Sequence, residues 1–308
     1  MEVVIPARDA GAFIGETLDS LRSSSFQAWK AWVVDDGSRD HTAAIAENTG
    51  DPRVALLKST GIGAPGARNR GLDEVRADFV LFLDADDRLP ASSLQRLYTT
   101  LCEHPASVLS YGRETLISDS GSPFGFPAPV ARGRYPSGNV LSTILADCFI
   151  PTPGAALLRT SAVRELGGFT PGLPASQDWE LWCRMAMLGE FSYVGATPII
   201  AHRIPAAALS RVASPERYQA ANRAVFSHPG IRGRFTAEEL AGLKRRREAR
   251  NYHNSAKEAL RRTDWQAALA WSRGSLVRQP WNPRAIVIGC CALLRYVPPF
   301  VRQRLGIL

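Results

Sequence analysis

The sequence predicts a layered α/β domain on an open sheet, followed by a basic, helix-rich region. Three observations support this class. Short apolar runs alternate with amphipathic stretches in the first half of the chain, as in strands joined by crossover helices. Three of these runs end in polar or acidic residues, which is typical of the carboxyl edge of a parallel sheet. Beyond about residue 212 the sequence becomes basic and rich in helix formers.

The expected elements follow from the position of these runs. Strands are predicted at 3–6, 31–38, 54–59 and 79–84. The first is followed by a helix with an apolar stripe of Phe13, Leu18 and Leu21, and the others by helices near 40–49, 65–75 and 91–103. The later elements are a strand at 107–117, a long loop at 118–137, a strand at 154–160, a helix at 176–189, a strand at 191–200 and one helical hairpin at 261–283. A loop of this length is usually a lid or a binding segment.

Composition indicates a globular chain with an asymmetric charge. The 308 residues, 45% of them hydrophobic, can bury one large domain with an appendage. Residues 1–240 carry 23 basic and 26 acidic side chains, a net charge of −3, whereas residues 241–308 carry 14 basic and three acidic ones, a net charge of +11. The positive charge therefore belongs to the C-terminal region.

Five cysteines without metal spacing favour a reduced, cytoplasmic compartment. The first residues lack the pattern of a signal peptide. The apolar run at 285–294 is ten residues long, whereas a spanning helix needs roughly 20. We therefore expect no signal peptide and no transmembrane helix.

The most informative stretch is FVLFLDADDRLP, where an apolar run enters three acids. Asp84 and Asp86, one residue apart on a turn, can face one point and attract Mg²⁺ or Mn²⁺. Since the carboxylates alone would repel a phosphate, the cation is expected to arrive with a diphosphate. Asp87 is expected to be a turn residue or the start of the next helix, and a single acid after a strand is most often a turn or capping residue. The glycine-rich loop 59–71 suits an anion near a helix N-terminus, although a merely flexible loop is equally compatible.

Together, VVIPARDAGAFIGETLDSL, WVVDDGSRDHT, GARNRGLDEVRADFVLFLDADDRLP and LGGFTPGLPASQDWELWCRMAMLG resemble the family 2 inverting glycosyltransferases of the GT-A fold. The resemblance covers about residues 2–205. It implies an α/β/α sandwich with a mixed, mainly parallel sheet over 1–212. The nucleotide-binding half would be about 1–105, the acceptor half about 106–212, and a basic helical region would occupy 213–308.

The resemblance also implies roles for particular residues. Those expected to hold the nucleotide donor are Pro6, Ala7, Arg8, Asp35, Asp36, Arg68 and Asp84. Among them Asp36 would contact the base and Arg68 the diphosphate. Asp86 would be the direct ligand of a divalent cation, Mn²⁺ or Mg²⁺. Asp178 would be the catalytic base, a role compatible with capping its helix.

Some features depart from the family pattern or stay open. His202 and Pro205 stand where many members have an aromatic residue and a histidine, so a metal or phosphate contact by His202 is left open. The processive signature Gln-x-x-Arg-Trp is absent, which favours transfer of single sugars. Trp179 and Trp182 are expected in the core more than against a sugar. The basic run 244–250 is either a solvated helical face or a peripheral contact with an anionic membrane. Nucleic-acid binding is not expected, since no recognition motif accompanies the charge.

The implied reaction moves one sugar, with inversion, from a nucleotide-diphosphate sugar to an acceptor hydroxyl. A UDP-sugar is the favoured donor, and the acceptor would be a glycan or a lipid-linked molecule in cell-envelope or polysaccharide synthesis. Two other classes of protein are the alternatives. A sugar nucleotidyltransferase would normally carry glycines and a basic residue after its first strand, where this chain has only ARDAG. An inactive GT-A-like protein would bind a partner through its helical tail.

Overall fold

The computed structural model describes residues 1–123, 135–204, 214–299 and 301. Its main element is a seven-stranded sheet in the order β3-β2-β1-β4-β7-β5-β8, and a second sheet pairs β6 with β9. The strands are β1 (Glu2–Ala7), β2 (Lys30–Asp35), β3 (Val54–Lys58), β4 (Phe79–Phe82), β5 (Ser107–Tyr111), β6 (Glu114–Ile117), β7 (Ala156–Arg159), β8 (Glu190–Tyr193) and β9 (Ile200–Arg203). Strands β1 to β4 are parallel, whereas β7 runs antiparallel to β4 and β5. The predicted mixed, mainly parallel sheet is confirmed.

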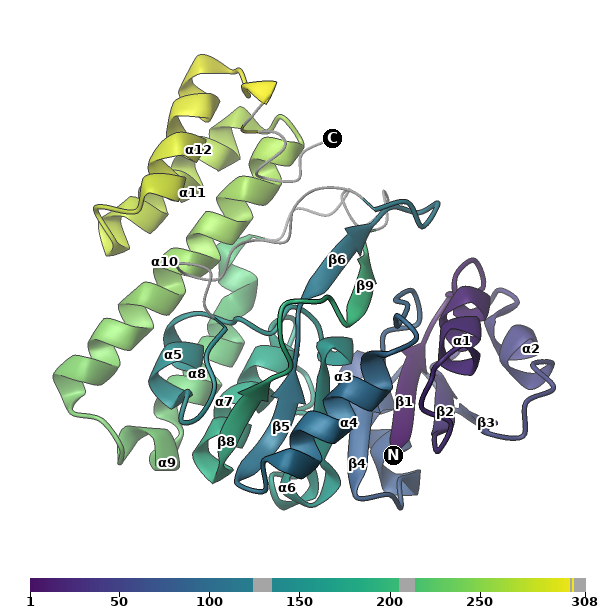
Figure 1. Ribbon diagram of the computed structural model, residues 1–308. Helices are drawn as coiled ribbons and strands as arrows, with labels where there is room; N and C mark the ends of the chain where they lie inside the picture. Colours follow the sequence, from purple (N-terminus) through teal and green to yellow (C-terminus); the bar gives the residue numbers. More distant parts are fainter. Residues whose placement is uncertain (124–134, 205–213, 300, 302–308) are drawn as a thin grey trace.

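The helices of the first part connect and cover this sheet (Figure 1). They are α1 (Ile14–Arg22), α2 (Thr42–Glu47), α3 (Gly63–Glu74), α4 (Ser93–Glu103), α5 (Leu141–Ala146), α6 (Thr160–Glu165) and α7 (Gln177–Leu188). The stripe predicted for the first helix is confirmed at Leu18 and Leu21, which are buried, whereas Phe13 precedes the helix. Trp179 and Trp182 are also fully buried, which confirms their expected place in the core.

Two predicted strands were wrong in extent. The run 107–117 divides into β5 in the large sheet and β6 in the small one, and 191–200 divides in the same way into β8 and β9. The division occurs at Gly112, where a side-chain Cβ would lie only 2.7 Å from Ile199 and 2.8 Å from Val194. The chain turns there under close packing, which a pattern of apolar residues does not show. Of the predicted loop 118–137, residues 124–134 lie outside the described residues, as does Pro205.

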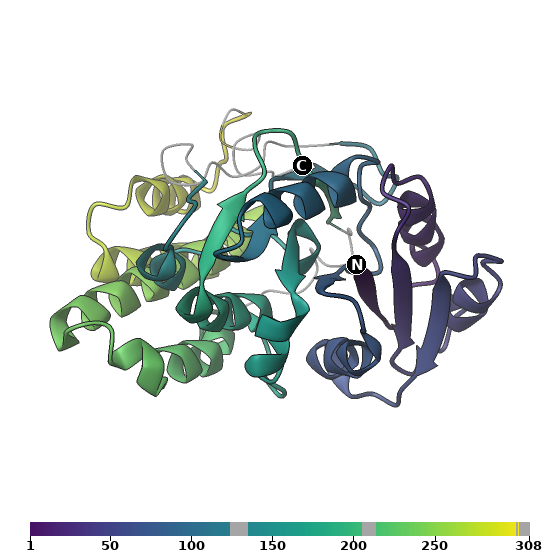
Figure 2. The same cartoon turned by 60° about the horizontal axis from the view of Figure 1, so that its bottom comes forward.

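The helical C-terminal region is confirmed. It comprises α8 (Gln219–Ser227), α9 (Pro229–Arg232), α10 (Ala237–Arg261), α11 (Trp265–Arg278) and α12 (Pro283–Leu294), preceded by the 3₁₀ helix η4 (Pro215–Tyr218). These helices stand at the β8 end of the sheet, opposite β3 (Figures 1 and 2). α8 and α9 contribute side chains to the main core, whereas a second small core joins the end of α10 to α11 and α12. In the described part of the chain, no helix combines the length and the hydrophobicity needed to cross a bilayer.

Helix α10 carries a buried ionisable group, His253. Burial, together with the nearby positive charges of Arg250, Lys257 and Arg284, lowers its pKa from 6.5 to about 3. A depressed pKa means that the unfolded chain takes up a proton below pH 6.5 and the native chain does not. Stability should therefore fall by on the order of 3 kcal/mol as the pH drops from 6.5 to about 4.

Urea titrations at several pH values between 7 and 4 should show this loss in the wild type. A His253→Gln variant, which keeps a polar side chain without the titration, should show a smaller slope of stability against pH over the same interval. Equal slopes for the two proteins would show that the titration of His253 does not cause the loss of stability.

Candidate active site

The carboxyl ends of β1, β2 and β4 bring together the residues predicted to bind the donor. Ala7 at the end of β1 pairs in register with Asp35 at the end of β2, and the Asp36 amide donates to the Ala7 carbonyl. The Leu83 amide, just after β4, donates to the carbonyl of Val4 in β1. Asp84 therefore leaves the sheet at the same edge as the first two strands, as the sequence predicts.

Asp36 fixes the glycine-rich loop to the end of β2. Its carboxylate accepts hydrogen bonds from the Ser59 hydroxyl at 2.7 Å and from the amides of Ile62 at 2.8 Å and Gly63 at 2.7 Å. Although burial opposes it, these bonds lower the pKa of Asp36. Asp36 thus anchors the N-terminus of α3, a structural role that sequence reasoning missed. Its contact with a nucleotide base stays a prediction.

A pocket of about 410 Å³ lies beyond this edge and collects the other predicted residues. It is lined by Arg68, Asp84, Pro151, Thr152, Pro153, Pro174, Ala175, Ser176, Gln177, Asp178, His202, Arg217 and Tyr218. Arg68, Asp84 and Asp178, which lie far apart in the sequence, therefore share one cavity. Pro6, Ala7, Arg8, Asp35 and Asp36 do not line this pocket and lie along the neighbouring strand ends. Asp86, the predicted cation ligand, does not line the pocket either and lies on the turn after β4.

Arg68 is held by an acid and an amide on two sides of the pocket. It donates to Asp84 at 2.7 Å and to Gln177 at 3.4 Å, and its guanidinium lies 5.1 Å from the Phe169 ring centroid. The side chain is buried, so its charge acts in a medium of low dielectric. This arrangement presents a fixed cation beside the first acid of the Asp-x-Asp turn. Gln177 was not predicted, although its place directly before Asp178 is a usable signal.

Asp178 lies on the first turn of α7 and not at its cap. The cap is Ser176, in the left-handed conformation, and the Asp178 carboxylate accepts one bond, from the Trp179 amide at 2.8 Å. Its second oxygen has no hydrogen-bond donor among the described residues. Burial raises the pKa of Asp178, while the Trp179 amide and the charges of Arg68 and Arg247 act in the opposite direction. A raised pKa makes the carboxylate a stronger proton acceptor than an ordinary aspartate.

The Asp-x-Asp turn is held by hydrogen bonds of the residue that follows it, Asp87. The Asp87 amide donates to the Asp84 carbonyl, which confirms Asp87 as a turn residue. Its carboxylate is fully buried, accepts the Arg203 amide at 2.8 Å and lies 3.4 Å from the Thr152 hydroxyl. Arg203 also donates through Nε to the Asp86 carbonyl at 2.9 Å. Thr152 and Arg203, which hold this turn, carry no sequence signal that we recognised.

Asp86 differs from both neighbouring acids because its carboxylate finds no hydrogen-bond partner on any other described residue. Burial and the charge of Asp84 raise its pKa. Within the described part of the chain, no three His, Cys, Asp or Glu side chains come close enough to hold an ion alone. Two carboxylates still suit a Mg²⁺ or Mn²⁺ ion, which commonly completes its shell with water and substrate phosphates. The residues present therefore fit a cation carried in with a diphosphate.

His202 also reaches this pocket. Its Nδ1 lies 2.6 Å from the Glu114 carboxylate, an ion pair across the small sheet. Burial disfavours its charged form, but the bond to Glu114 and the charges of Asp87 and Asp84 raise the pKa of His202 to about 9. The structure thus places the imidazole of His202 beside the site, and its contact with a metal or a phosphate stays a prediction.

The C-terminal region also approaches Asp178. Arg247 of α10 is buried, and its guanidinium lies 3.8 Å from the Trp179 ring centroid and donates to the Ser176 hydroxyl at 3.3 Å. Its Nε has no hydrogen-bond partner among the described residues. Of the basic run 244–250, therefore, one arginine packs under α7, and Arg250 pairs with Asp147 at 3.0 Å. Only part of this run is available to a membrane or to solvent.

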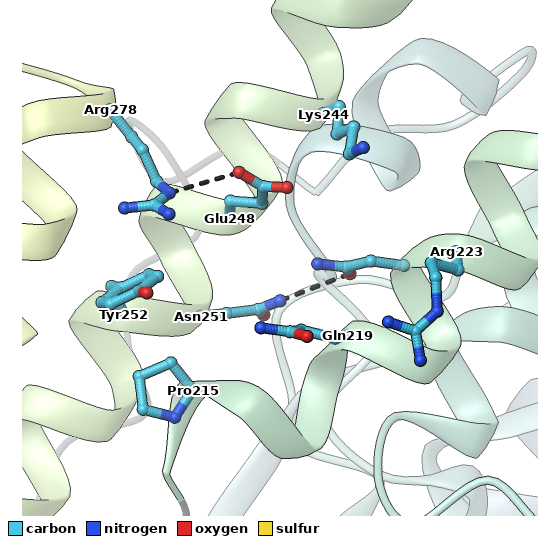
Figure 3. Close-up of a pocket in the computed structure, with 9 residues that line it drawn as sticks. Pro215, Gln219, Arg223, Lys244, Glu248, Asn251, Tyr252 and Arg278 are labelled. Carbon is cyan, nitrogen blue, oxygen red and sulfur yellow. Dashed lines mark hydrogen bonds and ion pairs between the residues drawn. The ribbon is translucent and has the colours of Figure 1, made fainter.

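A second pocket lies on the other side of η4 (Figure 3). It has a volume of about 260 Å³ and is lined by Pro215, Gln219, Asn222, Arg223, Lys244, Glu248, Asn251, Tyr252 and Arg278. Its one acid, Glu248, pairs with Arg278 at 3.2 Å. Because η4 contributes Pro215 to this pocket and Tyr218 to the first, both pockets share one wall. The C-terminal helices are therefore part of the surroundings of the site.

Comparisons with solved structures support the fold. Staphylococcus aureus TarS, residues 1–349 in complex with UDP, superposes with a TM-score of 0.63 at 16% identity, over 95% of this chain and 91% of that one. The same protein in complex with UDP-GlcNAc gives a TM-score of 0.64 at 15% identity, covering 96% of this chain and 92% of that one. The match extends into the helical C-terminal region. At this identity the likeness shows a shared GT-A-type fold.

Three sequence relatives are glycosyltransferases. The amylovoran biosynthesis glycosyltransferase AmsB of Erwinia amylovora is 40% identical over 100 residues, 30% of this chain and 33% of that protein. The PGL/p-HBAD biosynthesis glycosyltransferase Rv2957 of Mycobacterium tuberculosis is 35% identical over 115 residues, 36% and 44% of the two chains. The uncharacterized glycosyltransferase YibD of Escherichia coli is 29% identical over 123 residues, 39% and 36% of the two chains. The match thus spans less than half the length of these relatives.

The family itself is identified by the N-terminal half of the chain, which contains β1 to β4, β7 and the Asp-x-Asp turn. Residues 2–167 match the family described as glycosyl transferase family 2. The match covers more than half of the 308 residues. The chain therefore belongs to family 2 of the glycosyltransferases.

Proposed function

We propose that this protein transfers a single sugar from a nucleoside-diphosphate sugar to an acceptor hydroxyl, with inversion and with the help of a divalent cation. The observation that carries the proposal is the convergence of Arg68, Asp84 and Asp178 on one pocket at the carboxyl edge of the sheet. A buried cation suits a diphosphate, and a carboxylate of raised pKa suits a proton acceptor. TarS in complex with UDP and with UDP-GlcNAc supports a UDP-sugar as the donor.

In the proposed reaction, side chains of the protein accept the proton of the acceptor hydroxyl and stabilise the negative charge of the leaving diphosphate. The free carboxylate oxygen of Asp178 takes the proton of the acceptor hydroxyl, while the Trp179 amide holds the other oxygen. The acceptor oxygen bonds to the anomeric carbon as the bond to the diphosphate breaks on the opposite face. Arg68 stabilises the negative charge that grows on the leaving group. When bound at Asp84 and Asp86, Mg²⁺ or Mn²⁺ supplies further positive charge there.

The names of the relatives support a carbohydrate polymer or glycolipid pathway. AmsB takes part in amylovoran biosynthesis and Rv2957 in PGL/p-HBAD biosynthesis. We propose a glycan or lipid-linked acceptor in cell-envelope or polysaccharide synthesis, used from the cytoplasmic side. The absence of the processive signature supports one transfer per encounter.

The test is a donor screen with the full chain. UDP release from several UDP-sugars is measured with and without Mn²⁺, first as slow hydrolysis and then with candidate acceptors, and the product anomer is read by NMR. Release of UDP only with Mn²⁺, and a product of inverted configuration, are expected. A retained anomer would rule out single displacement. Release of pyrophosphate from a nucleoside triphosphate and a sugar phosphate would identify a nucleotidyltransferase, and absence of any turnover would favour the inactive partner-binding protein.

Arg247 should affect this reaction through Asp178, without contacting the substrate itself. Its positive charge lowers the pKa of Asp178 and its hydrogen bond holds the cap of α7. Replacing Arg247 with Met keeps most of the packing on Trp179 and removes the charge. We expect the acidic limb of the kcat profile to move to higher pH, and kcat at neutral pH to fall by on the order of tenfold.

The control is Lys244→Met, which removes an exposed positive charge from the same helix one turn earlier. It should leave the pH profile unchanged. If Arg247→Met lowers kcat equally at all pH values, its effect is on folding alone and the electrostatic role is wrong.

A further inference from the structure

The helix α12 is largely apolar, and in the described part of the chain it packs on one side only. Its inner side chains belong to the second core: Ala285, Ile288, Gly289, Cys291 and Ala292 are buried. Its outer side chains are Ile286, Val287, Cys290, Leu293 and Leu294, and Leu293 and Leu294 are 63% and 75% exposed. Helices that are hydrophobic all round are normally covered by protein or lipid. We therefore expect the outer side chains of α12 to contact another protein surface or a lipid.

Aromatic residues flank this surface. Trp281, two residues before α12, is 87% exposed, and Tyr296, two residues after its end, is 55% exposed. We call the surface formed by Trp281, the outer side chains of α12 and Tyr296 the α12 face. Trp and Tyr prefer the boundary between lipid and water, where the ring is partly apolar and its polar atom stays wet. The α12 face thus has an apolar centre with interfacial residues at its ends.

The sequence that contains α12 carries charged side chains of one sign, one of which, Arg278, pairs with Glu248 of α10. From residue 265 to the end the sequence contains no Asp or Glu and six arginines, at positions 273, 278, 284, 295, 302 and 304. A symmetric contact between two copies would bring arginine-rich segments together, and like charges would oppose it. An anionic surface would instead attract them. Charge complementarity therefore selects anionic lipid over a second copy as the cover.

We propose that the α12 face docks on the surface of an anionic phospholipid bilayer, with α12 lying in the plane of the interface. At 12 residues α12 is too short to cross the membrane, and an exposed apolar side with cationic flanks is the pattern of an interfacial helix. This contact differs from the basic run 244–250, of which Arg247 is buried and Arg250 is paired. The inference goes beyond the proposed function and does not depend on it, because binding is measured without sugar transfer.

The test is flotation of the full chain with phosphatidylcholine vesicles, either pure or containing one third phosphatidylglycerol. Wild-type protein should float with the anionic vesicles, less so at high salt, and not with the neutral ones. The double variant Leu293→Glu, Leu294→Glu should reduce the bound fraction at least about tenfold, since it removes buried apolar area and adds repulsive charge. The matched control is Leu188→Glu on α7, which changes another exposed leucine and should bind as the wild type does.

Two further measurements decide between the outcomes. The Trp281 emission should shift to the blue on adding anionic vesicles, and Trp281→Phe should remove the shift, whereas the buried Trp179 and Trp182 cannot produce it. Thermal unfolding should show that the double variant remains folded. Unchanged flotation of the folded double variant would overturn the proposal. So would a wild-type protein that ignores vesicles but forms dimers that the double variant abolishes, because a second copy would then cover the face.

Discussion

Replacing Asp178 with Asn is expected to lower kcat by about 10²- to 10⁴-fold, the usual contribution of a positioned general base. The amide has almost the same shape as the carboxylate and can still accept the Trp179 amide bond. We expect donor binding to depend on other residues of the pocket, above all the ion pair of Arg68 and Asp84. Calorimetric titration of UDP in the presence of Mn²⁺ should therefore give nearly the same affinity for wild type and variant.

The pH dependence gives an independent check. As a general base, Asp178 would act only when it is ionised, and burial raises its pKa above the ordinary value near 3.9. Wild-type kcat should thus fall as the pH drops through this raised pKa, and the residual activity of Asp178→Asn should lack that limb. Asp73→Asn, an exposed acid on α3, serves as the matched control with unchanged kcat. Wild-type turnover by the Asp178 variant would remove the residue from the mechanism.

The second large effect is expected for Asp86→Asn. Its carboxylate makes no hydrogen bond to another described residue, and burial together with Asp84 disfavours its charge. We infer that its function is to bind the cation, and a neutral amide is a poor ligand for Mg²⁺ or Mn²⁺. Turnover should fall by at least about 10²-fold, and the gain in UDP affinity on adding Mn²⁺ should disappear. EDTA should do the same to the wild type.

Stability separates this role from a structural one. Asp86→Asn should leave the free energy of unfolding equal or higher, because it relieves repulsion with Asp84. Asp87→Ala, one residue on, should instead cost about 1–3 kcal/mol, since it removes the acceptor of the buried Arg203 amide. Urea unfolding of both variants shows whether Asp86 has a structural role. A strongly destabilised Asp86 variant with intact Mn²⁺-dependent binding would contradict the assignment.

Local signals predicted much of the first half of the fold. The runs at 3–6, 31–38, 54–59 and 79–84 correspond to β1 to β4, because each parallel strand is a continuous apolar segment between turn residues. The runs at 107–117 and 191–200 failed, since each contributes to two sheets. Periodicity reports which residues are apolar and does not report which sheet buries them.

For the candidate site, too, local sequence signals predicted some residues and not others. Strand ends marked by acids located Asp35, Asp36 and Asp84 at one edge, and the resemblance supplied Asp178. Sequence reasoning missed Thr152 and Arg203, which fix the Asp-x-Asp turn, because hydroxyl and guanidinium groups there carry no local pattern. It also treated 244–250 as one charged run, whereas Arg247 is buried against Trp179.

By itself the sequence determined the α/β class, the strand ends that carry acids, the helical C-terminal region and the imbalance of charge between the two parts. Each of these depends on neighbours within a few residues, where backbone geometry and apolar spacing act directly. The tertiary structure alone decided that Arg68, Asp84 and Asp178 share one pocket, that α10 supports the helix of Asp178, and that one side of α12 is left uncovered. These relations join residues tens to hundreds of positions apart, and only packing of the whole chain determines which surfaces meet.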